Sequence, residues 1–267
     1  MKNDPKVYEF NNVRDFAIFL NLLIEITIKH LRKYDVYFNE LENFTLSKLD
    51  EPLKLLICAK EFDLENSRYN KNIGALKNIK IDYWELKALE DKLLTPKNLL
   101  LNAFADRTSN GVSYWRFRKE CEKKAKLDSK FDFKLVEFDE NIRAIINDLC
   151  SARNYEHHMT DAKFIEWRKY REKQLSNFSD PESIWPSEII QVDFYEDVEI
   201  TYLLSTYLAS KELRGYFKQL LQYMKKDYSK LIGKSMSINK ITHKQALSSK
   251  DSEISVNGVK RHEGKLH

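Results

Sequence analysis

An arginine, an asparagine and two adjacent histidines lie close together in the 267-residue chain: Arg153, Asn154, His157 and His158. Imidazole takes up and releases protons near neutral pH because its ordinary pKa is about 6.5. A guanidinium keeps its charge and presents a fork of N–H donors that matches a phosphate. Metal-free RNA cleavage needs such groups: a base for the ribose 2′-hydroxyl, a cation for the scissile phosphate and an acid for the leaving 5′-oxygen. The expected products are a 2′,3′-cyclic phosphate and a 5′-hydroxyl.

These residues close an apolar-periodic segment that predicts a helix. The apolar residues that recur at three- and four-residue spacing are Phe138, Ile142, Ile145 or Ile146, and Leu149. The same stripe next reaches Arg153, which therefore needs a carboxylate, a phosphate or an oligomer cleft beside it. His157 and His158 follow at about 40° and 140° around an ideal helix. Both histidines reach a ligand held by Arg153 only if the helix ends, kinks or meets a partner there.

The string Arg-Asn-Tyr-Glu-His-His resembles the signature of the HEPN superfamily, an arginine followed after four to six residues by a histidine. A small polar residue usually comes directly after that arginine, and Arg153, Asn154 and His158 occupy the three positions. The resemblance implies an all-helical domain that dimerises with its two signatures facing each other, and in many members a metal-independent ribonuclease. Such proteins recur in toxin–antitoxin and abortive-infection systems. Thr160 stands where some toxin members carry a tyrosine, which argues against regulation by modification of that tyrosine.

On this resemblance Arg153 holds the phosphate, His158 is the principal base and Asn154 orients the histidine or the phosphate. A symmetric dimer would bring His158 of both subunits to one cleft, or His157 would supply the second group within one chain. The implied partners are RNA, a second copy of the chain and an antitoxin or another defence-system protein. Neither a cofactor nor a metal is expected.

A basic segment follows the signature and predicts a helix from Ala162 to Phe178, capped by Thr160 or Asp161. Its charges begin within two turns of the histidines, so we expect this segment to bind RNA phosphates. The expected RNA-binding residues are Lys163, Arg168, Lys169 and Arg171. An earlier segment, Val112 to Leu127, also interleaves aromatic and basic residues, a pattern that is typical of a nucleic-acid-binding face. The simpler interpretation places its aromatic rings in the core and its lysines in solvent.

Two alternatives to catalysis stay open. In the first, Arg153 pairs with Asp148 or Glu156, both histidines are exposed at a helix end, and the domain only dimerises or binds RNA or protein. In the second, His157 and Asp161, with Glu156 or His158, form a metal site.

Composition favours an all-α fold, because six glycines and five prolines are few for this length. A net charge of +4 is compatible with RNA binding without being diagnostic of it. Cys58, Cys121 and Cys150 form no Cys-x-x-Cys pair, which indicates buried thiols in a reducing cytoplasm and gives no zinc motif. No signal peptide is visible, and the apolar run from Phe16 to Ile28 is too short to span a bilayer. We therefore expect a cytoplasmic protein without membrane association.

The expected organisation is a HEPN-type helical bundle over residues 128–233, additional N-terminal helices over 1–127 and a flexible, polar, basic tail over 234–267. The other expected helices are Val13 to Tyr34 capped by Asn12, Ser47 to Phe62 starting near Asp50, Asp82 to Leu94, Thr95-Pro96 to Asp106, Val112 to Leu127, and Glu188 to Ile232 with a restart at Ser210 and a stop at Gly233. Asp63 to Ile81 is expected to be a loop. The acidic residues Asp193, Glu196, Asp197 and Glu199 are expected in the first turns of a helix, where they favour its dipole without a metal.

Overall fold

The computed structural model describes residues 8–58, 79–128, 131, 133–157, 195–236 and 238. The internal contacts divide the chain into two units, Met1–Gly233 and Lys234–His267. All helices and strands described below belong to the first unit. Its helices are α1 (Val13–Ser47), α2 (Glu51–Cys58), α4 (Tyr83–Ala105), α5 (Tyr114–Leu127), α6 (Glu140–His157) and α8 (Ile200–Ile232). Two short strands, β1 (Lys80–Asp82) and β2 (Asp197–Glu199), complete the described elements. The described part of the chain is therefore predominantly α-helical, as predicted.

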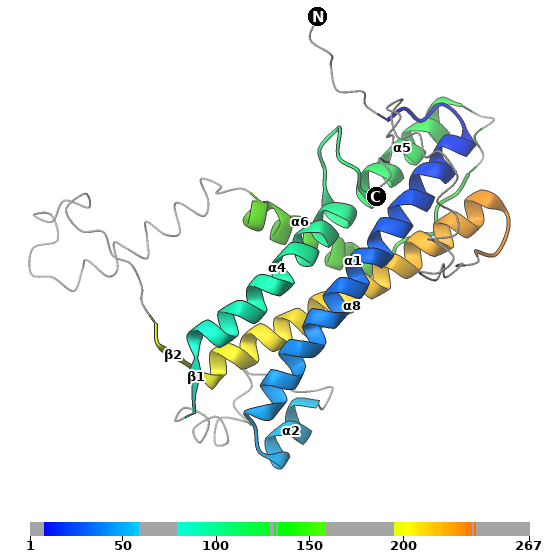
Figure 1. The fold of residues 1–267 in the computed structure, drawn as a ribbon. Helices are drawn as coiled ribbons and strands as arrows, with labels where there is room; N and C mark the ends of the chain where they lie inside the picture. The colour runs from blue at the N-terminus through cyan, green and yellow to red at the C-terminus, as the bar shows by residue number, and fades with distance from the viewer. Residues whose placement is uncertain are drawn as a thin grey trace, which may run out of the picture. The chain divides into compact units, whose positions relative to one another are not determined.

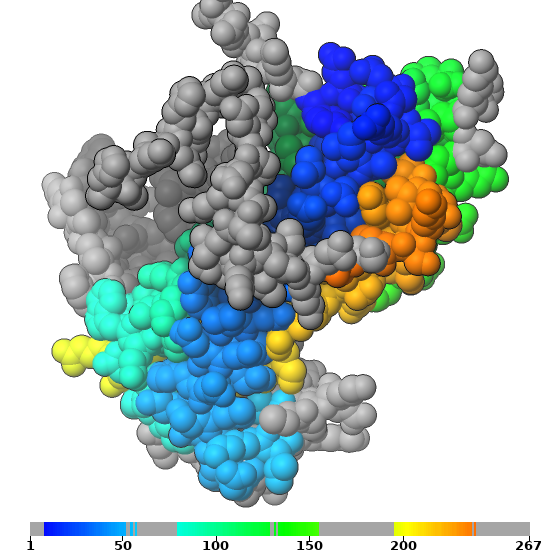
Figure 2. Space-filling view, turned by 45° about the vertical axis from the view of Figure 1, so that its right-hand side comes forward, coloured from blue at the N-terminus to red at the C-terminus, as the bar shows by residue number. Residues whose placement is uncertain are grey.

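The longest helix, α1, begins where the sequence predicts. The Asn12 side chain accepts a hydrogen bond from the Asp15 amide, and the Asp15 carboxylate accepts one from the Asn12 amide, which satisfies two donors at the helix start. The predicted end at Tyr34 is wrong, because Phe38 and Leu41 continue the buried stripe and the helix runs on to Ser47. The helix α1 packs against both α4 and α8 and runs in the opposite direction to them (Figure 1). In the space-filling view, parts of α4 and α8 lie on opposite sides of α1 (Figure 2).

The helix α4 is continuous through Pro96, so the predicted division at Thr95-Pro96 is wrong. Its start is as predicted, since the Asp82 side chain accepts a hydrogen bond from the Glu85 amide at 2.8 Å. A proline inside a helix removes one backbone hydrogen bond. Leu93, Pro96 and Leu100 are nevertheless buried in succession on α4, and this packing outweighs the lost bond.

The strands β1 and β2 pair in antiparallel register, with Ile81 opposite Val198. Each strand leads directly into a long helix, so the pair fixes the beginnings of α4 and α8 together. Asp197 and Glu199 lie in β2 and not in the first turn of a helix, which corrects the prediction, and Asp197 forms an ion pair with Lys80 at 3.2 Å. Glu196 directly precedes the strand, and Asp193 lies outside the described residues.

The helix α8 shows no interruption at Ser210, where a restart was predicted. It buries a continuous apolar face that includes Tyr207 and Phe217 on either side of that serine. Gly233 ends the helix with φ +65°, as predicted, because this left-handed conformation suits a residue without a Cβ. The short α2 begins at Glu51, next to the predicted start, whereas Ser47 still belongs to α1. Residues 59–62 of the predicted helix lie outside the described residues, as do most of the predicted loop and of the tail.

The aromatic and basic residues of α5 separate as the simpler interpretation predicts, with one correction. Tyr114 and Phe117 are buried and Lys119 is exposed. Arg116 and Arg118, however, also turn inward. Arg116 is 6% exposed, and its guanidinium donates to the carbonyl oxygens of Gly111 and Tyr8.

Arg118 forms an ion pair with a fully buried residue, Asp227 of α8. One oxygen of Asp227 accepts hydrogen bonds from the Tyr114 hydroxyl at 2.6 Å and from Arg118 at 2.9 Å, and the other accepts from the Val136 amide at 2.7 Å. Burial raises the pKa of Asp227, although Arg118 opposes this effect. The network joins α5, α8 and the segment that leads into α6.

Replacing Asp227 with alanine should lower the free energy of unfolding by about 3–5 kcal/mol, because Arg118 would lose its carboxylate in a buried site. The exposed Gln222 of the same helix is the matched control, and Gln222→Ala should change stability by less than about 0.5 kcal/mol. Urea denaturation followed by circular dichroism measures both values. A loss below about 1 kcal/mol for Asp227→Ala would contradict the role given to this network.

Candidate functional site

The buried face of α6 leads to Arg153, as the sequence predicts. Ile142, Ile145 and Leu149 are buried, and the Arg153 side chain on the same face is 13% exposed. Phe138 was predicted as part of the helix but precedes it. The Asp139 side chain accepts a hydrogen bond from the Ile142 amide and so caps a helix that begins at Glu140.

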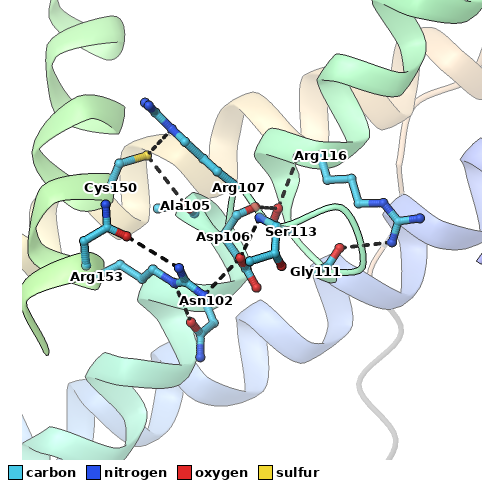
Figure 3. Close-up of polar contacts among 11 residues, drawn as sticks. Asn102, Ala105, Asp106, Arg107, Gly111, Ser113, Arg116, Cys150 and Arg153 are labelled. Atoms are coloured by element: carbon cyan, nitrogen blue, oxygen red, sulfur yellow. Dashed lines mark hydrogen bonds and ion pairs between the residues drawn. The ribbon is translucent and has the colours of Figure 1, made fainter. Parts of the chain in front are cut away.

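Arg153 is held by polar groups at the end of α4 (Figure 3). Its Nη2 forms an ion pair with Asp106 at 3.0 Å, and its Nε donates to the Asn102 side-chain oxygen at 3.3 Å. Its Nη1 also donates to the side-chain oxygen of Asn154, at 3.5 Å. The expectation that Arg153 needs an anionic partner is confirmed. The partner is Asp106 and not Asp148, and the side chain of Glu156 is not among those described.

The guanidinium retains hydrogen-bonding capacity. Arginine has five N–H groups. If one is counted for each of the contacts with Asp106, Asn102 and Asn154, two remain without a partner among the residues that the structure describes. An anion such as a phosphate can accept from these two groups while the other three keep the side chain in place.

Asp106 is itself fixed by the loop between α4 and α5. Its side chain accepts a hydrogen bond from the Thr108 amide at 2.9 Å, and its backbone carbonyl accepts one from the Ser113 hydroxyl. Gly111 packs so closely that a Cβ there would lie 2.6 Å from the Asp106 Cγ, so only glycine fits without a shift. From its sequence, this loop predicts only that a helix ends before it. No spacing rule connects Asp106 with Arg153.

A second arginine, Arg107, lies near Cys150, as Arg153 also does, and was not predicted as a site residue. It is exposed, yet its Nε donates to the Cys150 sulfur at 3.1 Å and its Nη2 to the Asn147 side-chain oxygen at 3.1 Å. The Cys150 thiol in turn contacts the Ala105 carbonyl oxygen at 3.6 Å. Within the described ranges, no carboxylate forms an ion pair with Arg107.

Cys150 positions Arg107 and is a poor nucleophile. Burial raises the pKa of its thiol by more than Arg107 and Arg153 lower it, so the reactive thiolate is disfavoured. Cys121 is likewise a buried free thiol, and burial raises its pKa strongly. The prediction of small buried side chains is confirmed for these two cysteines, while the side chain of Cys58 is not among those described.

The structure describes only a small part of the two adjacent histidines, His157 and His158. The backbone of α6 runs to His157, whose side chain is not described, and His158 lies outside the described residues. The same holds for the predicted helix from Ala162 to Phe178 and for its expected RNA-binding residues Lys163, Arg168, Lys169 and Arg171. The convergence of Arg153 with a histidine therefore stays a prediction.

The described residues also bear on a metal site and on membrane-spanning helices. The alternative metal site depends on Asp161 and the two histidines, which lie outside the described side chains. Elsewhere, in the ranges that the structure describes, no three His, Cys, Asp or Glu side chains are grouped so as to hold a metal ion. None of the described helices is long and apolar enough to cross a membrane.

A double-mutant cycle should show that Arg153 and Asp106 stabilise each other. Combining Arg153→Ala with Asp106→Ala is expected to give a coupling energy of about 1–2 kcal/mol, because the ion pair is mostly shielded from water. The exposed pair Lys48–Glu85 is the control and should couple by less than about 0.5 kcal/mol. Equal coupling in the two cycles would contradict the special position of Arg153.

Comparisons with known proteins add no relative from which a role could be transferred. The chain matches no protein-family model, no curated protein and no solved structure. The functional argument therefore rests on the chain's own residues: a shielded arginine, a fixed second arginine, and two histidines that follow in the sequence.

Proposed function

We propose that this chain is a HEPN-type, metal-independent endoribonuclease that acts as a homodimer in a toxin–antitoxin or anti-phage defence system. The observation that carries the proposal is the state of Arg153. Its guanidinium is shielded and oriented by Asn102 and Asp106, and two of its N–H groups have no partner among the residues that the structure describes. The helical fold of the described residues agrees with the architecture that the resemblance implies. The proposed setting is the cytoplasm.

In the proposed reaction, Arg153 binds the scissile phosphate. A shielded guanidinium interacts strongly with charge that builds up on the phosphate oxygens, because little water screens it. Asn102 and Asp106 hold the side chain before RNA arrives, so little ordering is needed at the reaction step. The Arg153–Asp106 pair has no net charge, and RNA must therefore be attracted by other cations. Lys163, Arg168, Lys169 and Arg171 are proposed for this role.

His158 is the proposed general base. It removes the proton from the ribose 2′-hydroxyl, and the 2′-oxygen attacks phosphorus while the bond from phosphorus to the 5′-oxygen breaks. A second imidazole, His158 of the other subunit or His157 of the same chain, then gives a proton to the 5′-oxygen. Asn154 orients the histidine or the phosphate. One signature in each chain favours a dimer, since two-fold symmetry brings two copies of His158 to one cleft.

A second candidate function is a non-catalytic module of the same fold that dimerises or binds RNA or protein. Asp106 is the observation in its favour, because a guanidinium that already has a carboxylate needs no phosphate to be stable near the core. The two candidates differ in a single property. Only the nuclease produces RNA fragments.

Purified protein should cleave single-stranded RNA in the presence of EDTA, and Arg153→Ala or His158→Ala should each reduce the rate by at least about 100-fold. Arg153→Lys should restore only part of the loss, since an ammonium keeps the charge without the fork. Arg32, an exposed arginine of α1, provides the control, and Arg32→Ala should cleave like the wild type.

Circular dichroism and thermal unfolding show whether each variant keeps its fold. Cleavage that persists in both folded Arg153→Ala and His158→Ala would remove the proposed site. If no RNA product forms at any concentration of wild-type protein, the non-catalytic module is the correct assignment.

A further inference from the structure

An exposed cation, a half-buried indole ring and a second exposed cation lie together, and the first cation contacts Cys150. They are Arg107, in the loop after α4, and Trp115 and Lys119, one turn apart on α5. The Arg107 guanidinium carbon lies 5.7 Å from the centroid of the Trp115 ring, and the Lys119 ammonium lies 4.9 Å from the same centroid. We name these three residues the Arg107 surface.

Arg107 is unusually well prepared to bind an anion. An exposed arginine normally samples many rotamers. Two hydrogen bonds to α6 restrict the rotamers of Arg107, because its Nε donates to the Cys150 sulfur and its Nη2 to the Asn147 side-chain oxygen. Of its five N–H groups, two are used and three remain without a partner in the described part of the chain. In contrast to Arg153 and Arg118, which pair with aspartates, Arg107 has no carboxylate to neutralise it there.

The Arg107 surface is connected to Arg153 through α6. Asn147 and Cys150 lie about two turns and one turn before Arg153 on that helix. Both arginines also come from positions next to the end of α4, since the residues that hold Arg153 there are Asn102 and Asp106, and Arg107 follows directly. The same two elements, α6 and the end of α4, therefore position both arginines.

The ring of Trp115 gives the surface its chemical selectivity. An indole face binds unpaired bases by stacking, whereas a duplex keeps its bases stacked on one another. Both cations lie over the Trp115 ring, so a base that stacks there replaces one of them, and the cations can then bind the phosphates that flank the base. Lys123 and Lys126, which are also exposed, extend the positive charge along α5, although Glu120 lies 3.9 Å from Lys123.

We propose that the Arg107 surface binds single-stranded RNA next to Arg153, with a phosphate on Arg107, a base on Trp115 and a second phosphate on Lys119. Cys150 and Asn147 are positioning residues for Arg107. The choice of RNA as the polymer rests on the proposed function. The preference for a single strand comes from the ring and its two cations.

Binding can be measured without cleavage by using a 2′-O-methyl RNA oligonucleotide, which lacks the attacking hydroxyl. Fluorescence anisotropy at about 0.1 M salt should show binding to the wild type and about tenfold weaker binding to Arg107→Gln. Loss of this phosphate contact should also reduce the slope of log Kd against log salt by about 1. Lys119→Gln should weaken binding several-fold, and Arg32→Gln on α1 should not change it.

Two additional readouts test the stacking and positioning roles. RNA should quench part of the tryptophan fluorescence of the wild type, and Trp115→Phe should lose that part while it keeps a ring and a folded core. Cys150→Ala, which removes the acceptor for the Arg107 Nε, should weaken binding in the same direction as Arg107→Gln.

The outcomes separate this inference from the proposed function. Unchanged affinity in both Arg107→Gln and Lys119→Gln overturns the inference, even if the protein cleaves RNA. Weakened binding in both variants supports it, even if the wild type never cleaves RNA and the proposed nuclease function fails. Equal loss of affinity in Arg32→Gln, or equally tight binding of a duplex of the same sequence, would also overturn it.

Discussion

The burial of one long apolar stripe on α1 is the constraint on which the rest of the structure depends. Residues from Phe16 to Phe38 fill the space between α1 and the two helices that run antiparallel to it, α4 and α8. The β1–β2 pair joins these two helices at their beginnings. This packing fixes the end of α4. Asn102 in the last turns of that helix and Asp106 directly after it therefore hold Arg153 in place. Such support keeps a binding group close to its working geometry.

Two arginines near the core are paired with aspartates. Asp227 is fully buried, and Arg118, Tyr114 and a backbone amide together satisfy its oxygens. Arg118 and Arg153 are similarly shielded, with side chains 12% and 13% exposed. Each uses three of its five N–H groups on partners in the described part of the chain, so hydrogen-bonding capacity alone does not single out Arg153. The proposed site lies at the end of α6 because Arg153 stands shortly before the two adjacent histidines in the sequence.

Local interactions could be predicted from the sequence, and long-range ones could not. The caps at Asn12 and Asp82 involve residues three positions apart, so the sequence pattern is enough to find them. The helix through Pro96 could not be predicted, because packing against other helices outweighs the local preference of proline. The same distinction applies to the site. The apolar stripe predicts that Arg153 needs an anion, but Asp106 comes from a distant loop whose position only the packed helices determine.

The chemistry of the RNA ends tests most directly whether Arg153 and the histidine act on a phosphodiester. The wild-type protein is incubated in EDTA with an end-labelled RNA oligonucleotide and with the same oligonucleotide carrying a 2′-deoxyribose at the cleavage position. The proposed mechanism predicts a 2′,3′-cyclic phosphate and a 5′-hydroxyl from the first oligonucleotide and no cleavage of the second. Products with a 3′-hydroxyl and a 5′-phosphate, or cleavage next to the 2′-deoxyribose, would contradict it.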